Sequence, residues 1–154
     1  MITTVYPLSS HGGAIVIPDG MAMDFLNNDV KRIICIFQNG KKLHGMINKG
    51  EQVYFLMVGK QTAREYGVIP GDEIDVQFIE DTTRYQMAVS EEFLEVLTTD
   101  PEGEDLFHQL TPGKQRSVLH SINKIKSSNL RIEKALRLME NLRRGQSDLK
   151  LLLK

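Results

Sequence analysis

The side chains that could do catalytic chemistry in this chain are few and widely spaced. Cys35 is the one cysteine, and it lies inside the apolar run RIICIF, which predicts a small buried hydrophobe. The four histidines are His11, His44, His108 and His120, and they do not have the spacing of metal ligands. We expect them to be solvated or singly hydrogen-bonded. No serine stands in a G-x-S-x-G elbow. These absences predict a non-enzymatic protein with no metal site and no cofactor.

Two other patterns resemble binding sites but have structural explanations. Gly12-Gly13 precedes a predicted strand and does not open a helix, so it lacks the helix dipole that captures phosphate. Asp72, Glu73 and Asp75 could form a paired-carboxylate site. However, Asp72 fits a turn, and the other two alternate with apolar residues along a strand, which predicts a solvated face.

Charge is distributed unevenly, although the net charge is only −1. Residues 1–90 contain eight Lys/Arg and ten Asp/Glu, and residues 91–110 contain seven acids and no base. Residues 111–154 contain eleven bases and three acids, with no aromatic residue. These bases could contact an anionic partner, or they could pair with the acidic segment 91–110 inside the protein. The lack of aromatic side chains for base stacking argues against nucleic-acid binding.

The composition predicts a folded protein with one domain or two small ones. Hydrophobic residues make up 41% of the 154 residues and charged residues 25%, which is typical of globular proteins. No apolar run approaches the roughly 18 residues of a membrane span. The N-terminal MITTVYPLSS lacks the basic and apolar regions of a signal peptide. We therefore expect a cytoplasmic location.

The first eighty residues predict short strands separated by turns. The runs GGAIVIP, KRIICIF, KLHGMIN, VYFLMV and EIDVQF are bounded by Gly, Pro, Asn and Asp. Asn39-Gly40 predicts a type I′ hairpin turn. Residues 60–66 predict a short helix that ends at Gly67, and Pro70-Gly71 predicts a type II turn before the last strand. About six strands with one or two helices predict a small, closed or nearly closed β-barrel.

The periodicity changes to that of helices after residues 80–90. Ser90, Asp100 and Thr111 are helix N-cap residues, and the last two are followed by proline. Gly145 ends the final long helix, and we expect the leucine-rich tail QSDLKLLLK to pack on the barrel or on a partner. The predicted class is α+β, with a small barrel domain over residues 1–85 and an all-helical region over residues 86–154.

Residues 89–145 resemble the C-terminal helical region of the bacterial YdeI/OmpD-associated, or bacteriocin-protection, family. The barrel resembles the small domain of unknown function that often precedes this region, which is of the double-split type and distantly similar to AbrB-like barrels. The stretch Leu119–Ile122 departs from the family by carrying no aromatic residue. The positions that carry the helical resemblance are Leu97, Asp100, Phe107, Leu110, Pro112, Arg116, Ile122, Lys126, Arg131, Ile132, Lys134 and Ala135.

The resemblance and the charge pattern together predict an interaction protein linked to resistance to antimicrobial peptides or stress. Its partner would be an unidentified protein or other anionic molecule that contacts the basic helices, with the oligomeric state left open. The alternatives are an AbrB-like DNA-binding regulator, for which residues 1–90 are unusually acidic, and a small-molecule binder or enzyme that uses the barrel interior. The predicted contact residues are Arg116, Lys126, Arg131 and Lys134.

Overall fold

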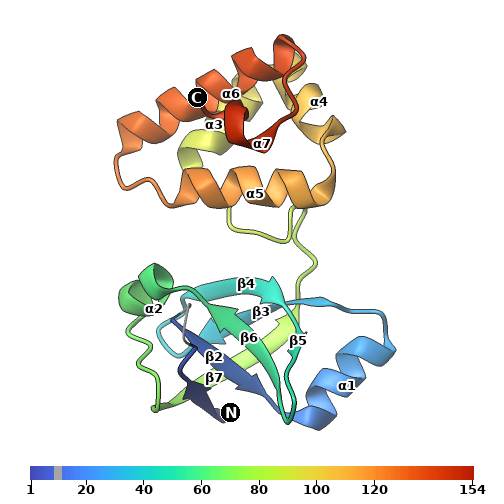
Figure 1. Ribbon diagram of the computed structural model, residues 1–154, viewed down its shortest axis with the longest axis vertical. Helices are drawn as coiled ribbons and strands as arrows, with labels where there is room; N and C mark the ends of the chain where they lie inside the picture. The colour runs from blue at the N-terminus through green and yellow to red at the C-terminus, as the bar shows by residue number, and fades with distance from the viewer. Residues whose placement is uncertain (9–11) are drawn as a thin grey trace. The chain divides into compact units, whose positions relative to one another are not determined.

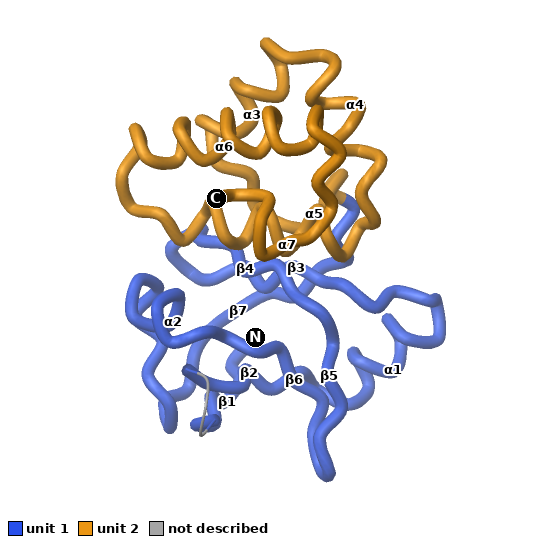
Figure 2. The backbone as a smooth tube through the Cα atoms, turned by 45° about the horizontal axis from the view of Figure 1, so that its top comes forward, with its two compact units in different colours: residues 1–82 blue, residues 83–154 orange. Residues whose placement is uncertain are grey.

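The computed structural model describes residues 1–8 and 12–154, and His11 lies outside these described residues. The chain divides into two compact units, residues 1–82 and 83–154 (Figure 2). Strands and two helices form the first unit, and helices form the second (Figure 1), which confirms the predicted α+β class.

The first unit is a nearly closed antiparallel barrel. Within the described residues its strands follow the order β4-β3-β7-β1-β2-β6-β5. Strand β4 approaches β6 at Gly45, where an added Cβ would lie 2.5 Å from Cδ1 of Leu56. The missing side chain at Gly45 therefore allows the close approach of these two strands. The strands are β1 (Ile2–Tyr6), β2 (Gly13–Ile17), β3 (Arg32–Phe37), β4 (Lys42–Met46), β5 (Asn48–Lys49), β6 (Tyr54–Val58) and β7 (Glu73–Glu80).

Apolar side chains from alternate strand positions fill the barrel interior. Val76 and Phe78 of β7 point inward, while Glu73 and Asp75 are exposed, as the alternation predicts. Two helices lie on opposite sides of the barrel, α1 (Asp19–Asn27) and α2 (Lys60–Tyr66) (Figure 1). The buried core contains Val5, Ile15, Ile17, Ala22, Ile33, Cys35, Phe37, Ile47, Leu56, Val58, Ala63, Val68, Val76 and Phe78.

The turn predicted before β7 is confirmed in detail. Gly67 ends α2 with a left-handed φ of 68°. Asp72 N–H then donates to the Ile69 carbonyl at 3.0 Å, and Gly71 has a φ of 96°, which together define a type II turn. Proline at position i+1 and glycine at i+2 are the residues that this turn geometry favours.

The hairpin between β3 and β4 is confirmed, but the predicted type I′ turn is wrong. Gly40 has a φ of 84°, whereas Asn39 is not among the non-glycine residues with positive φ. Gly40 N–H donates to the Phe37 carbonyl at 2.8 Å and Phe37 N–H donates to the Lys41 carbonyl at 2.9 Å, so the loop has three residues, 38–40. The Asn39 side chain instead accepts from Lys41 N–H at 3.0 Å, which satisfies the backbone without a left-handed asparagine.

The second unit contains five helices among its described residues: α3 (Glu91–Thr99), α4 (Pro101–Gln109), α5 (Pro112–Asn123), α6 (Ser128–Arg143) and α7 (Leu149–Leu152). Ser90, Asp100 and Thr111 cap α3, α4 and α5 through their side-chain oxygens, as predicted. Gly145 has the left-handed φ of 80° expected of a residue that follows the end of a helix.

The C-terminal tail packs within the helical unit, so the expectation that it packs on the barrel or a partner is wrong. Leu152 of α7 is fully buried. It joins Phe93 and Phe107, whose rings meet edge to face at 5.1 Å, in the core of this unit. In the described residues, none of the helices has the length and apolar character needed to cross a membrane.

Candidate functional site

The predicted contact residue Arg131 lies between two elements of the helical unit. Its guanidinium on α6 donates to the Glu92 carboxylate of α3 at 2.7 Å and to the Ile125 carbonyl at 2.6 Å. Only 22% of the Arg131 side chain and 15% of the Glu92 side chain are exposed. The hydrogen bond from Arg131 lowers the Glu92 pKa to about 2, so the pair is ionised at neutral pH.

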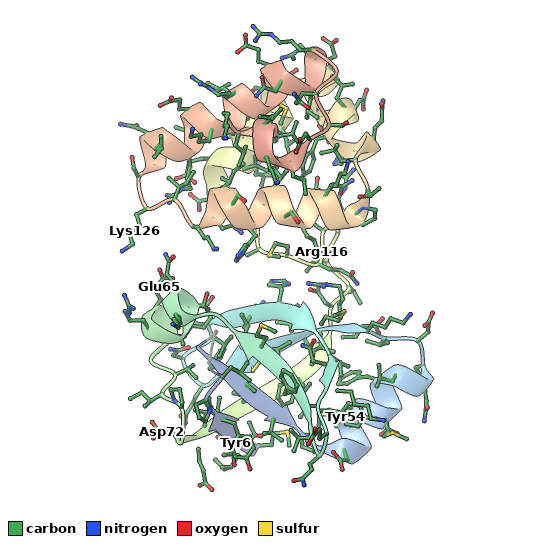
Figure 3. All side chains as sticks on the ribbon, viewed as in Figure 1. Tyr6, Tyr54, Glu65, Asp72, Arg116 and Lys126 are labelled. Atoms are coloured by element: carbon green, nitrogen blue, oxygen red, sulfur yellow. The ribbon has the colours of Figure 1, made fainter. Side chains whose placement is uncertain are left out.

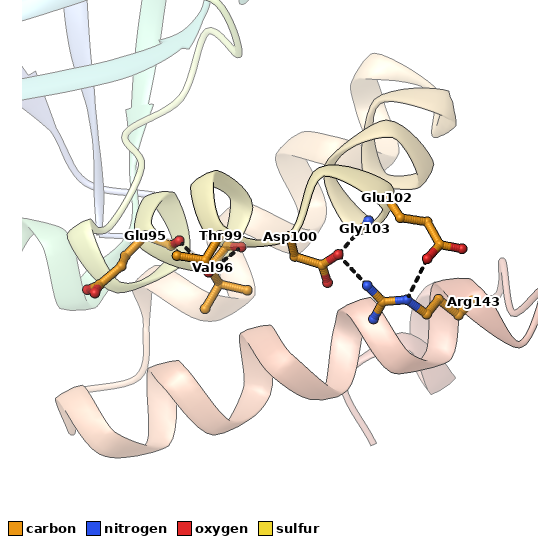
Figure 4. A network of polar contacts seen from close by, with 7 residues as sticks. All are labelled: Glu95, Val96, Thr99, Asp100, Glu102, Gly103 and Arg143. Carbon is orange, nitrogen blue, oxygen red and sulfur yellow. Dashed lines mark hydrogen bonds and ion pairs between the residues drawn. The ribbon is translucent and has the colours of Figure 1, made fainter.

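A second junction joins the start of α4 to the end of α6 (Figure 4). The Asp100 carboxylate accepts from Gly103 N–H at 3.0 Å and from the Arg143 guanidinium, which also contacts Glu102 at 3.4 Å. These two donors, the backbone N–H first, lower the Asp100 pKa. The acidic and basic segments thus meet inside the helical unit at two places, with α6 supplying both arginines.

Lys134 is also engaged within the unit. Its ammonium donates to the Leu153 carbonyl at 3.0 Å, which ties α6 to the C-terminal tail. Arg131 and Lys134 therefore have structural contacts of their own. Whether either residue also contacts a partner stays a prediction.

The face of α5 that points away from the core of the helical unit carries positive charge. Arg116, His120 and Lys124 follow one another at intervals of four residues along the helix, so they share a face. The buried residues Val118, Leu119 and Ile122 occupy the opposite face. Burial and the neighbouring Lys124 cation lower the His120 pKa, which favours its neutral form.

Lys126 extends this basic face into the loop that follows α5 (Figure 3). Within the described residues, no ion pair involves Arg116, Lys124 or Lys126. The helix itself contains no acidic residue. We call Arg116, His120, Lys124 and Lys126 the α5 basic face. The four predicted residues thus separate into Arg116 and Lys126, which lie on this face, and Arg131 and Lys134, which do not.

A polar cluster that the sequence did not indicate lies where the second unit begins. The Tyr85 hydroxyl is 2.7 Å from Nε2 of His108, and the Arg84 guanidinium is 3.3 Å from Nδ1 of the same ring. A guanidinium can only donate, so Nδ1 accepts and the proton of a neutral ring is on Nε2, directed at the Tyr85 oxygen. The tyrosine keeps its own hydroxyl proton for another acceptor, and burial raises its pKa.

The residue pattern marks the region of this cluster only as a connecting stretch. Arg84-Tyr85 falls in the connecting stretch EDTTRYQMA, which has neither helical nor strand periodicity, and His108 lies 23 residues further along the chain. Gln86, next to Tyr85, has a φ of 52°, a left-handed conformation that non-glycine residues adopt mainly at constrained positions. Backbone conformation of this kind is not visible in the residue pattern.

In the barrel, the cysteine and the histidine that could do chemistry are held in or beside the core. Cys35 is fully buried, as predicted, and burial raises its pKa to about 12. His44 is 2.6 Å from the buried Asp81 carboxylate through Nδ1. Across the described part of the chain, no group of three or more His, Cys, Asp or Glu side chains is placed to hold a metal ion.

Comparison with known proteins found one similarity, in the helical region. Residues 86–145 match the family described as Bacteriocin-protection, YdeI or OmpD-Associated. The matched range runs from the residue after Tyr85 to Gly145 and contains α3, α4, α5 and α6, so the resemblance predicted for this region is confirmed. Searches of curated proteins and of solved structures gave no match.

Proposed function

We propose that this protein is a non-enzymatic, cytoplasmic interaction protein that contributes to resistance against antimicrobial peptides or related stress. The match of residues 86–145 to the bacteriocin-protection family supports the biological role. We further propose that the α5 basic face contacts an anionic partner, which is a protein or another molecule with clustered negative charge.

One observation carries the choice of surface. The α6 arginines Arg131 and Arg143 face carboxylates of α3 and α4, so their charge is used to join helices. Arg116, Lys124 and Lys126 have no such counter-charge in the described residues. Uncompensated cations gathered on one surface attract anionic partners and orient their approach.

The test reverses the charge of the α5 basic face and leaves α6 intact. A triple variant with Arg116→Glu, Lys124→Glu and Lys126→Glu is compared with a control triple, Lys60→Glu, Lys150→Glu and Lys154→Glu, which changes the net charge equally at exposed lysines that have no ion pair in the described residues. Arg131 and Lys134 are left out because they have structural contacts within the unit. Cells that lack the gene are complemented with each form and challenged with a cationic antimicrobial peptide.

We expect the α5 triple variant to fail to restore survival and to lose its cross-linked partners, while the control triple restores both. Equal protein levels on immunoblots establish that the variant is folded and stable in the cell. Full complementation by the α5 triple variant would eliminate this surface. A deletion strain as resistant as its parent would eliminate the proposed role in resistance.

The alternative proposal is an AbrB-like, double-split form of the barrel that binds DNA as a regulator. The feature in its favour is the helix, type II turn and strand around Gly67, Pro70 and Gly71. Residues 1–82 contain seven Lys/Arg and ten Asp/Glu, a balance of −3 that opposes phosphate binding. Gel shifts over a series of salt concentrations test it, since phosphate contacts require affinity to fall steeply with salt.

A further inference from the structure

The helical unit contains a groove that the proposed function does not use. Its volume is about 290 Å³, and Met87, Val89, Leu94 and Leu97 form its apolar part. Small-molecule sites usually occupy roughly 300–1,000 Å³, so this groove suits one or two side chains and not a large cofactor. Leu94 is 53% exposed, which leaves apolar surface available to another molecule.

Polar groups of opposite character line the other part of the groove. Arg84 and Tyr85 provide donors, and the Tyr85 hydroxyl proton is available because His108 Nε2–H occupies its oxygen. The Glu104 carboxylate lines the same groove and has no ion-pair partner among the described residues. A molecule that fits all of these groups needs an acceptor, an apolar group and a cation.

Negative charge continues beyond the groove along α3. Glu91 and Glu95 are exposed and lie beside Leu94 and Thr98 on the helix surface, at spacings of three and four residues. No base occurs between residues 91 and 110, so nothing in this segment offsets the two carboxylates. An occupant that extends out of the groove along α3 therefore meets acidic residues.

We propose that this groove binds a peptide segment that carries a large apolar side chain next to basic residues. The apolar side chain would pack on Leu94 and Leu97, a peptide carbonyl would accept from Tyr85 or Arg84, and a lysine or arginine would pair with Glu104. A peptide supplies these three groups together and also reaches Glu91 and Glu95. The site differs in position and in sign of charge from the α5 basic face. This proposal can therefore be tested independently of the proposed function.

The test measures binding of a short fluorescein-labelled peptide of alternating leucine and lysine to the full chain by fluorescence anisotropy. We expect saturable binding that Leu94→Asn and Glu104→Gln each weaken by about tenfold, as loss of a central anchor does. Matched controls are Leu136→Asn, since Leu136 is 55% exposed on α6, and Asp105→Asn, beside Glu104 but outside the groove lining. Both controls should bind the peptide like the parent protein.

Three comparison ligands separate the contributions. A serine–lysine peptide lacks the apolar anchor, a leucine–glutamate peptide reverses the charge, and leucine amide lacks the extension along α3. Each should bind at least about tenfold more weakly than the leucine–lysine peptide. Equal binding of any of these ligands, or unchanged binding by both groove variants, would overturn the proposal. Thr98→Arg adds a cation to the groove at an exposed position and should block the peptide while leaving the fold unchanged.

Discussion

Arg131 and Glu92 are 39 residues apart in the sequence, and their side chains meet across 2.7 Å between α6 and α3. This contact shows that the basic residues of the C-terminal segment do not all have the same role. Arg131 and Arg143 of α6 join helices, whereas Arg116, Lys124 and Lys126 of the α5 basic face have no ion pair in the described residues. A binding surface chosen from charge alone would include both the α6 arginines and the α5 basic face. Only the contacts of these residues distinguish the two groups.

Asp100 is predicted to stabilise the helical unit mainly as a helix cap. Replacing a capping Asp by Ala costs about 1 kcal/mol, and Asp100→Ala also removes a partner of Arg143. We expect a loss of about 1–2 kcal/mol in the free energy of unfolding, measured by urea denaturation. Asp100→Asn keeps an oxygen that can accept from Gly103 N–H, so it should lose less than about half of this. Equal losses in the two variants would show that the ion pair dominates.

Gly103 is predicted to be required for the approach of α4 to α6. An added Cβ would lie 2.5 Å from the Met139 sulfur and 2.6 Å from Oδ2 of Asp100, and Met139 is itself buried. Alanine improves helix propensity by about 1 kcal/mol, but overpacking typically costs about 1–3 kcal/mol. We therefore expect Gly103→Ala to lower the melting temperature.

Gly113→Ala is the matched control for this prediction. Gly113 is exposed on α5, and an added Cβ would contact nothing within 4 Å. The same substitution should therefore leave stability unchanged or raise it by up to about 1 kcal/mol. A stabilised Gly103→Ala protein would mean that α4 and α6 can separate slightly at no cost.

The features predicted correctly from the sequence are those that depend on neighbouring residues. The caps at Ser90, Asp100 and Thr111 need only a side-chain oxygen and an N–H two or three residues later. The turn at Pro70-Gly71 depends on the φ preferences of two adjacent residues. Such local preferences are the same in many folds, so they can be predicted from a single sequence.

The features that were missed depend on distant parts of the chain. Leu152 reaches the helical core because α7 folds back, and nothing in QSDLKLLLK specifies which apolar surface it covers. Tyr85 and His108 are 23 residues apart, so their contact depends on how α3 and α4 pack. The turn type at Asn39-Gly40 was predicted wrongly although it is a local feature. The Asn39 side chain accepts from Lys41 N–H and so favours another turn geometry.

Gly71 is predicted to be required for the turn before β7. Its φ of 96° is strained for any residue with a Cβ, so Gly71→Ala should destabilise the protein by about 1 kcal/mol or more. Gly20→Ala on α1 is the control, because Gly20 does not have a positive φ and its surroundings are open. The two unfolding free energies, measured in urea, should change in opposite directions or by clearly different amounts.

The Glu92–Arg131 pair predicts how stability depends on pH. The folded-state pKa of Glu92 is about 2, below its ordinary value of 4.5, so ionised Glu92 stabilises the fold above pH 4.5. This contribution is lost as the pH falls from about 4.5 toward 2. We expect Glu92→Gln to be less stable than the parent at pH 7, with the difference in unfolding free energy shrinking as acid is added.

The control for this prediction is Glu95→Gln. Glu95 lies on the same helix and is exposed, and its carboxylate has no ion-pair partner among the described residues. Urea unfolding of the parent and of both variants between pH 7 and pH 2.5 separates the pair from the general effect of acid, since Asp100 contributes equally to all three proteins. A constant difference between Glu92→Gln and the parent across this range would mean that Glu92 keeps its ordinary pKa and that packing alone joins α3 to α6.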